Sequence, residues 1–231
     1  MRFFIFYIFF SSAILMKAQS PFISFRTSFQ NDDYKSSQRV LDSCSFAKYE
    51  MDSVLYYKGL LTLKKGNIKG ARLLAKDIQN TYPSFNEVHY LNALIYFNQE
   101  DYGNSIDEFT VLIMQNPQHM KARYNRSIAH GLLDNYLSAI DDLSACITVD
   151  SSFAMGYYSR AYWYEFSGNY EEAKKDYEQS IKLDPKNYDA YFGLAYIYQN
   201  QKERTKACET IRSAVSAGSQ IAEELSENFC R

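Results

Sequence analysis

Residues 154–187 read AMGYYSRAYWYEFSGNYEEAKKDYEQSIKLDPKN, and this stretch decides the fold. On each side of Gly168-Asn169, apolar and aromatic residues recur at spacings of three and four, which is the spacing of one face of an α-helix. Gly168-Asn169 interrupts the first run, and Asp184-Pro185 ends the second because proline cannot continue the helical hydrogen-bond ladder. The stretch therefore predicts two short amphipathic helices joined by a tight turn.

The same pattern recurs along the chain with a period of 34 residues. Pro83, Pro117 and Pro185 are separated by 34 residues and by twice that number. Small residues follow the period without a gap: Ala71, Ser105, Ala139, Ala173 and Ala207. The turn residues do so as well: Gly66-Asn67-Ile68, Glu100-Asp101-Tyr102, Asp134-Asn135-Tyr136 and Gly168-Asn169-Tyr170. A fixed period of this length indicates a solenoid, in which each copy buries its apolar face against the next.

This pattern resembles the tetratricopeptide repeat (TPR) family. In the copy at 154–187, the signature positions of the family are filled by Tyr157, Ala161, Tyr164, Ala173, Tyr177 and Pro185. The resemblance implies an all-α, right-handed solenoid over residues 47–221, built from five stacked helix-turn-helix repeats. These repeats lie near 52–85, 86–119, 120–153, 154–187 and 188–221, and the first and third match the signature less well.

The two ends of the solenoid need separate predictions. Gly218 ends the last repeat, and the residues that follow predict a short capping helix whose end covers 222–231. Its apolar side carries Ile221, Ala222, Leu225 and Phe229. The N-terminal segment, 19–46, shows no match to the repeat. We expect its first part to be extended and Asp32 to Ser43 to form a helix that covers the first repeat.

The first 18 residues have the layout of a secretory signal peptide, with Arg2, an apolar run from Phe3 to Met16, and Ala18. The apolar run is shorter than the roughly 20 residues that a membrane-spanning helix needs. We expect cleavage after Ala18, export to the bacterial periplasm or beyond, and no membrane insertion afterwards. An uncleaved membrane anchor is the alternative.

Charge and cysteine content exclude several classes of protein. Lys plus Arg number 25 and Asp plus Glu 27, so the chain lacks the basic surplus that binding to nucleic acid requires. The four cysteines contain no C-x-x-C pair, which argues against a zinc site. Gly218 lies near the midpoint between Cys208 and Cys230, so two helices folded back at this glycine bring the two thiols to similar heights and predict a disulfide. We expect Cys146 to stay a buried thiol.

No catalytic constellation is present in the sequence. The three histidines, His89, His119 and His130, form no metal or nucleophile motif. Neighbouring acidic residues such as Asp141-Asp142 and Glu171-Glu172 are expected to be a solvated surface. We therefore predict no catalytic residue, no metal and no cofactor.

In this family the first helices line the inner surface of the solenoid, which places two rows of residues there. The first row is Tyr56, Tyr90, Tyr124, Tyr158 and Phe192, and the second is Leu60, Leu94, Ile128, Tyr162 and Tyr196. Packing between neighbouring first helices is an alternative explanation of the first row. The basic segment from Lys121 to Arg126 either holds a ligand carboxylate or pairs with a neighbouring repeat. The predicted groove comprises Tyr56, Tyr90, Leu94, Lys121, Tyr124, Asn125, Tyr158, Tyr162, Phe192 and Tyr196.

These features predict a non-enzymatic scaffold that binds a peptide or protein in an aromatic groove. One alternative is a carbohydrate-binding protein in which Tyr and Trp163 stack on sugar rings, and another is an accessory subunit of a cell-envelope assembly complex. We also expect the N-terminal segment, with Phe22, Ile23, Phe25 and Phe29, to occupy the groove as an internal plug. This groove lies around Tyr90, Tyr124, Tyr158 and Tyr162. A disordered leader is the alternative to the plug.

Overall fold

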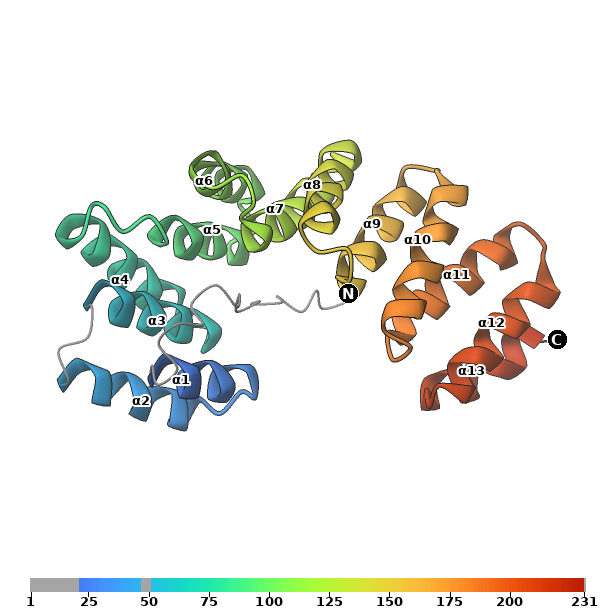
Figure 1. Ribbon diagram of the computed structural model, residues 1–231, viewed down its shortest axis with the longest axis horizontal. Coiled ribbons are helices and arrows are strands. Elements are labelled where there is room, and N and C mark those ends of the chain that lie inside the picture. Colours follow the sequence, from blue (N-terminus) through green and yellow to red (C-terminus); the bar gives the residue numbers. More distant parts are fainter. Residues whose placement is uncertain (1–20, 47–50, 231) are drawn as a thin grey trace. The chain divides into compact units, whose positions relative to one another are not determined.

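The computed structural model describes residues 21–46 and 51–230, which form thirteen α-helices and, within these ranges, no strand (Figure 1). The first helices of the successive pairs are α1 (Pro21–Gln30), α3 (Met51–Lys64), α5 (Val88–Asn98), α7 (Met120–Leu132), α9 (Ala154–Phe166) and α11 (Tyr188–Asn200). The second helices are α2 (Tyr34–Phe46), α4 (Ile68–Thr81), α6 (Tyr102–Gln115), α8 (Tyr136–Val149), α10 (Tyr170–Leu183) and α12 (Arg204–Ser216). Helix α13 (Gln220–Cys230) follows α12. The predicted all-α fold of stacked helix pairs is confirmed, and the predicted signal peptide lies outside the described residues.

Two compact units divide these helices, one up to Asn125 and the other from Arg126, and each is described by itself.

The turn inside each helix pair has the same backbone conformation. One residue per turn has a positive φ, and these residues are spaced by 34: Asp32, Gly66, Glu100, Asp134, Gly168 and Lys202, with φ between 57° and 82°. Glycine adopts this conformation at no steric cost, aspartate adopts it more often than most other residues, and Glu100 and Lys202 are of types that seldom do. The spacing shows that the repeat begins one copy earlier than the sequence predicted.

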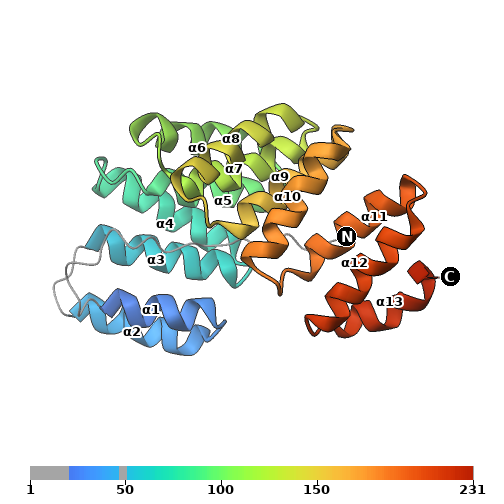
Figure 2. The same ribbon diagram turned by 45° about the vertical axis from the view of Figure 1, so that its right-hand side comes forward.

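The N-terminal segment is a sixth helix pair, so the prediction that its first part is extended was wrong. Asp32-Asp33-Tyr34 matches the other turns, and Ser37 continues the series of small residues as a fully buried side chain. Ser37 donates to the Asp33 carbonyl at 2.9 Å and bonds to Ser28 Oγ at 2.9 Å. In the sequence, the turn residues and the small residue Ser37 indicated this helix pair. The copy lacks the aromatic residues and the proline of the family signature. Figure 2 shows α1 and α2 side by side next to α3.

Phe25 and Phe29 of α1 lie in the core of the first unit. Both are almost fully buried, and the Phe25 ring centroid is 5.1 Å from that of Tyr57 on α3. Lys64 links α3 to α1 at the same place, because its Nζ donates to the Phe29 carbonyl at 2.8 Å and lies 4.5 Å from the Phe29 ring centroid. These two side chains therefore extend the stack against α3, and the plug prediction is wrong for them. The Phe22 and Ile23 side chains lie outside the described residues.

In the second unit, close approach of the helices depends on residues without a bulky side chain. Ala161, Ala173 and Ala190 are fully buried in one apolar cluster. Gly193 lies directly against the ring of Tyr177, where any larger residue would overlap it. The period of small residues in the sequence is thus explained by packing between helices.

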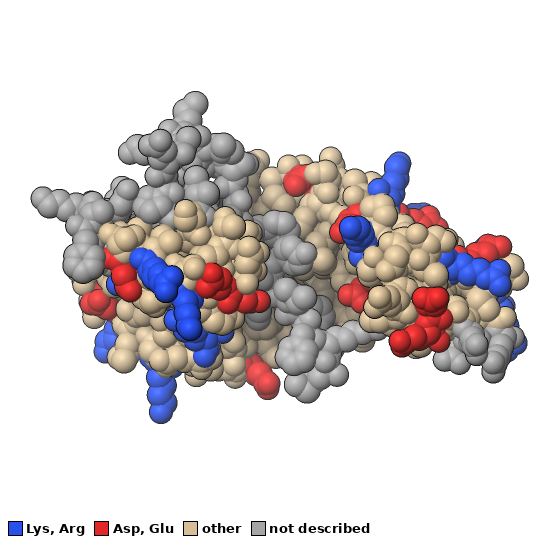
Figure 3. Space-filling view, turned by 90° about the horizontal axis from the view of Figure 1, so that it is seen from below, with Lys and Arg blue, Asp and Glu red and all other residues tan. Residues whose placement is uncertain are grey.

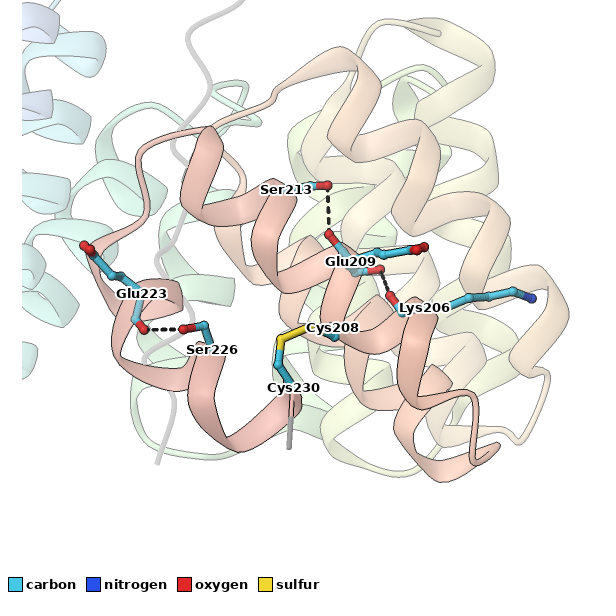
Figure 4. Close-up of a disulfide and its surroundings, with 8 residues drawn as sticks. Lys206, Cys208, Glu209, Ser213, Glu223, Ser226 and Cys230 are labelled. Atoms are coloured by element: carbon cyan, nitrogen blue, oxygen red, sulfur yellow. Dashed lines mark hydrogen bonds between the residues drawn. A yellow bond between two sulfur atoms is a disulfide. The ribbon is translucent and has the colours of Figure 1, made fainter.

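Helix α13 packs on α12 and is fastened at both ends. The Gly218 turn, with φ 98°, closes one end, and the Tyr188 hydroxyl donates to the Ala217 carbonyl there at 3.0 Å. At the other end, the predicted disulfide joins Cys208 and Cys230, whose Cα atoms are 4.8 Å apart (Figure 4). A cross-link that closes a loop of this length contributes about 2–4 kcal/mol.

Candidate binding surface

In the first unit, the predicted groove residues are mostly core residues. Tyr56 is 8% exposed, Tyr90 1% and Tyr124 4%, and Leu94 and Asn125 are buried as well. They lie on successive first helices, between neighbouring repeats. Core packing, the alternative explanation given for the first row, therefore accounts for them. These five residues therefore do not line a groove in this structure. Lys121 is half-buried.

A buried polar contact accounts for Asn125. Its Nδ2 donates to the Tyr90 hydroxyl at 2.8 Å and to the Lys121 carbonyl at 2.9 Å. The Tyr90 ring packs against Phe109 and stacks on His119, and burial raises the pKa of its hydroxyl well above the usual range. The Asn125 side chain thus belongs to the internal contacts of the first unit.

The basic segment is also engaged internally. Arg126 makes a bidentate pair with Asp142, at 2.8 and 2.7 Å, and Asp142 is only 2% exposed. The sequence predicted that Asp142 belongs to a solvated acidic surface. Its burial shows that this prediction was wrong for Asp142. One repeat later, Arg160 and Asp176 form the same pair at 2.6 and 2.9 Å, and the pKa of Arg160 is raised by the hydrogen bond to Asp176. The common spacing of 16 residues was the signal in the sequence.

Accessible aromatic residues remain on the first helices of the second unit. Tyr158, Tyr162 and Phe192 are half-buried, and Tyr196 is 51% exposed. Phe166, which the sequence analysis missed, is 53% exposed, and its ring centroid is 4.8 Å from that of Tyr162. Phe166 follows Tyr162 by one helical turn, so the helical period could have identified it. We call Tyr158, Tyr162, Phe166, Phe192 and Tyr196 the aromatic face.

Acidic residues accompany the aromatic face. Glu165 follows Tyr162 by three residues on α9, and Asp189 precedes Phe192 by three on α11, so both lie on the same helical sides as the aromatic rings. Glu165 accepts a hydrogen bond from the buried Tyr177 hydroxyl at 2.8 Å, which holds its carboxylate in place. The only cation of α9 is Arg160, which Asp176 holds, and α11 contains no Lys or Arg.

The histidines do not form a common site. Nδ1 of His89 lies 2.6 Å from Oε2 of Glu108, and Nε2 of His119 lies 3.5 Å from Oε1 of Glu87. His130, in the second unit, is half-buried, and burial lowers the pKa of its imidazole. In the part of the chain that the structure describes, no group of three His, Cys, Asp or Glu side chains is placed to hold a metal ion.

Surface charge is mixed in sign. Figure 3 shows basic and acidic side chains interspersed over the face it displays, without a large patch of one sign among the described residues. None of the described helices combines the length and apolar character needed to cross a bilayer.

Comparison with known proteins agrees with the helix-pair architecture. The family description "TPR repeat" matches residues 167–202, and "Tetratricopeptide repeat" matches 188–217. Human "Superkiller complex protein 3" is 38% identical over 73 residues, which are 30% of this chain and only 5% of that protein.

Two solved structures share the fold at low sequence identity. A tetratricopeptide repeat protein from Parabacteroides merdae is 17% identical, with a TM-score of 0.59 over 91% of this chain and 98% of the other. MamA from Desulfovibrio magneticus is also 17% identical, with a TM-score of 0.66 over 73% of this chain and 96% of the other.

Stacked helix pairs of constant length, joined by equivalent turns, define the class of helical-repeat proteins. The matched repeats specify the family further: the chain is a tetratricopeptide-repeat protein. Such a fold is a scaffold for protein–protein interaction.

Proposed function

We propose that this protein binds a peptide or an extended protein segment on the aromatic face of the second unit. The observation that carries the proposal is the exposure of this face, because Tyr196 and Phe166 remain about half exposed, whereas Leu60 and Leu94, which stand at the position of Tyr196 in the first unit, are buried. Tyrosine and phenylalanine offer a large contact area with few rotatable bonds, which suits peptide recognition.

Charge favours a segment that combines apolar residues with Lys or Arg. Glu165 and Asp189 lie beside the rings, and α9 and α11 offer no cation outside the Arg160–Asp176 pair. A cationic side chain over Tyr162 or Tyr196 would gain a cation–π contact and an ion pair with the adjacent carboxylate. An acidic segment would meet repulsion at the same place.

The test measures binding of fluorescent peptide sets to the full mature chain, with basic, neutral and acidic members of equal hydrophobicity. We expect the basic set to bind most tightly and to weaken as salt is added. Tyr196→Ser should weaken binding about tenfold. The matched control is Tyr170→Ser, which removes a tyrosine of similar exposure, 45%, from α10. Equal effects of the two variants, or preference for acidic peptides, would contradict the proposal.

The carbohydrate alternative loses its strongest residue, because Trp163 is only 3% exposed and contacts Tyr162 and Tyr136. A role as an accessory subunit of a cell-envelope assembly differs from the leading proposal in its partner, which would be a folded surface. Pull-down of a protein partner without binding of any free peptide would favour that role.

We also propose that the mature protein is exported by a bacterium. The layout of residues 1–18 supports export, and so does the Cys208–Cys230 disulfide, because such bonds persist in oxidising compartments. Mass spectrometry of the protein from its own cells should show a chain that begins at Gln19. A full-length chain with reduced cysteines in the cytoplasm would contradict export.

A further inference from the structure

The final helix, α13, is attached to the rest of the second unit in an unusual way. It is joined to α12 by the short turn at Gly218 and, twelve residues further on, by the Cys208–Cys230 disulfide. Figure 4 shows the disulfide at the end of the α12–α13 hairpin away from that turn. The disulfide therefore closes the end of the α12–α13 hairpin that lies away from the turn.

Few of the described side chains of α13 are buried. Among its described side chains, Ala222 alone is fully buried, Leu225 is half-buried, and Ile221 is 62% exposed. Ser219 caps the helix by accepting a hydrogen bond from the Ala222 amide at 3.2 Å. Among the described side chains, burial of one methyl group and part of a leucine stabilises a docked helix less than the cross-link does.

One residue of the disulfide lies at the surface, and the other is half-buried, in contrast to the two free cysteines. Cys230 is exposed, whereas Cys44 and Cys146 are buried thiols that are 1% and 0% exposed. Burial also raises the pKa of the Cys44 thiol, which lowers its reactivity. Among the described cysteines, the pair whose disulfide fastens α13 is thus the one most accessible to a redox reagent.

We propose that α13 is a redox-controlled cap, closed when Cys208 and Cys230 are bonded and released when they are reduced. The reductant is a dithiol. One of its thiolates attacks Sγ of Cys230, the S–S bond breaks, and Cys208 leaves as a thiolate that takes up a proton. The second thiol of the reductant then attacks the mixed disulfide and releases Cys230, so two electrons and two protons pass to the protein and the reductant becomes a disulfide.

Release uncovers the end of the last repeat. Ala222 packs there in an apolar cluster with Tyr191, Ala195, Ile211 and Ala214. Two of these residues belong to α11, the helix that also carries Phe192 and Tyr196 of the aromatic face. Opening of the cap therefore exposes apolar surface beside that face, although the device does not depend on what the face binds.

The test is hydrogen exchange of the mature chain with and without a dithiol reductant. We expect exchange of the α13 amides to rise about thirtyfold or more on reduction, with α9 and α10 unchanged. The double variant Cys208→Ser/Cys230→Ser should exchange at the fast rate in both conditions. Removal of the reductant under oxidising conditions should restore protection in the unmodified chain.

Two outcomes would overturn the proposal. Unchanged protection of α13 in the reduced chain and in the double variant would mean that packing alone holds the helix. Loss of protection throughout α9 to α12 would mean that the disulfide supports the whole unit and is not a local switch.

Discussion

Arg126 and Arg160 occupy the same position in successive repeats, and each holds a nearly buried aspartate with two hydrogen bonds. Asp176→Asn should lower the free energy of unfolding by about 2–4 kcal/mol, because a partly buried guanidinium loses its counter-charge. Denaturant unfolding measures the change. The double variant Arg160→Met/Asp176→Leu should recover most of the loss, since it leaves no charge unpaired. Equal losses in the single and double variants would contradict this account.

Gly131 is required by a neighbouring ring. A Cβ atom built at this position would overlap the indole of Trp163. We therefore expect Gly131→Ala to lower the melting temperature and to cost about 1–3 kcal/mol. The matched control is Gly103→Ala in α6, where nothing lies within 4 Å of the added atom. That change should raise stability by about 0.4–1 kcal/mol, because alanine has less backbone freedom in the unfolded chain.

His130 predicts a dependence of stability on pH. Burial lowers its pKa in the folded protein below the ordinary value of 6.5, so the unfolded chain binds the proton more readily. Stability should therefore rise with pH between the lowered pKa and 6.5. Above that range, the loss of stability caused by protonation of the unfolded chain should vanish. Denaturant midpoints measured from pH 5 to 7.5 should vary less in His130→Gln. Identical pH profiles of the two proteins would contradict the role of His130.

At the scale of elements, the N-terminal helix pair stabilises the first unit by packing. Phe25→Ala should lower the free energy of unfolding by about 3–5 kcal/mol, because it removes a fully buried ring that contacts Tyr57. Ser24→Ala, next to it on the exposed side of α1, should change stability by less than about 0.5 kcal/mol. A removable plug would give the opposite result: raised peptide affinity in Phe25→Ala with little loss of stability.

The elements differ in how far the sequence could predict them. The helix pairs followed from a period shared by prolines, small residues and turns, and the Cys208–Cys230 pair followed from the distances of both cysteines from Gly218. The first helix pair was missed because Phe25 stands where later repeats have Gly59 and Ala161, and because the copy ends without proline. Only Ser37 and the turn residues Asp32-Asp33-Tyr34 carried its period.

At the scale of the molecule, the binding surface was harder to predict than the fold. The sequence placed ten residues on one face, yet Tyr90 and Tyr158 stand at the same repeat position and differ in burial. Both rings pack against the equivalent aromatic residue of their own repeat, Phe109 and Tyr177. Tyr90 also stacks on His119 and accepts a hydrogen bond from Asn125 of the next repeat, whereas Asn187 and Gly193 stand at the matching positions near Tyr158. Neighbours of this kind come from tertiary packing, which a single-sequence period does not specify.

The contact of Arg160 with the preceding repeat has a consequence for how such a chain can grow. Arg160 donates to Ser144 Oγ at 3.0 Å, across the boundary between two copies. A tandem duplication of residues 154–187 would place the new Arg160 opposite Glu178, which stands one period after Ser144. The new junction would thus gain an attractive charge pair and require no new core. The contacts at the boundary between repeats therefore permit the chain to be lengthened by duplication of whole copies of this segment.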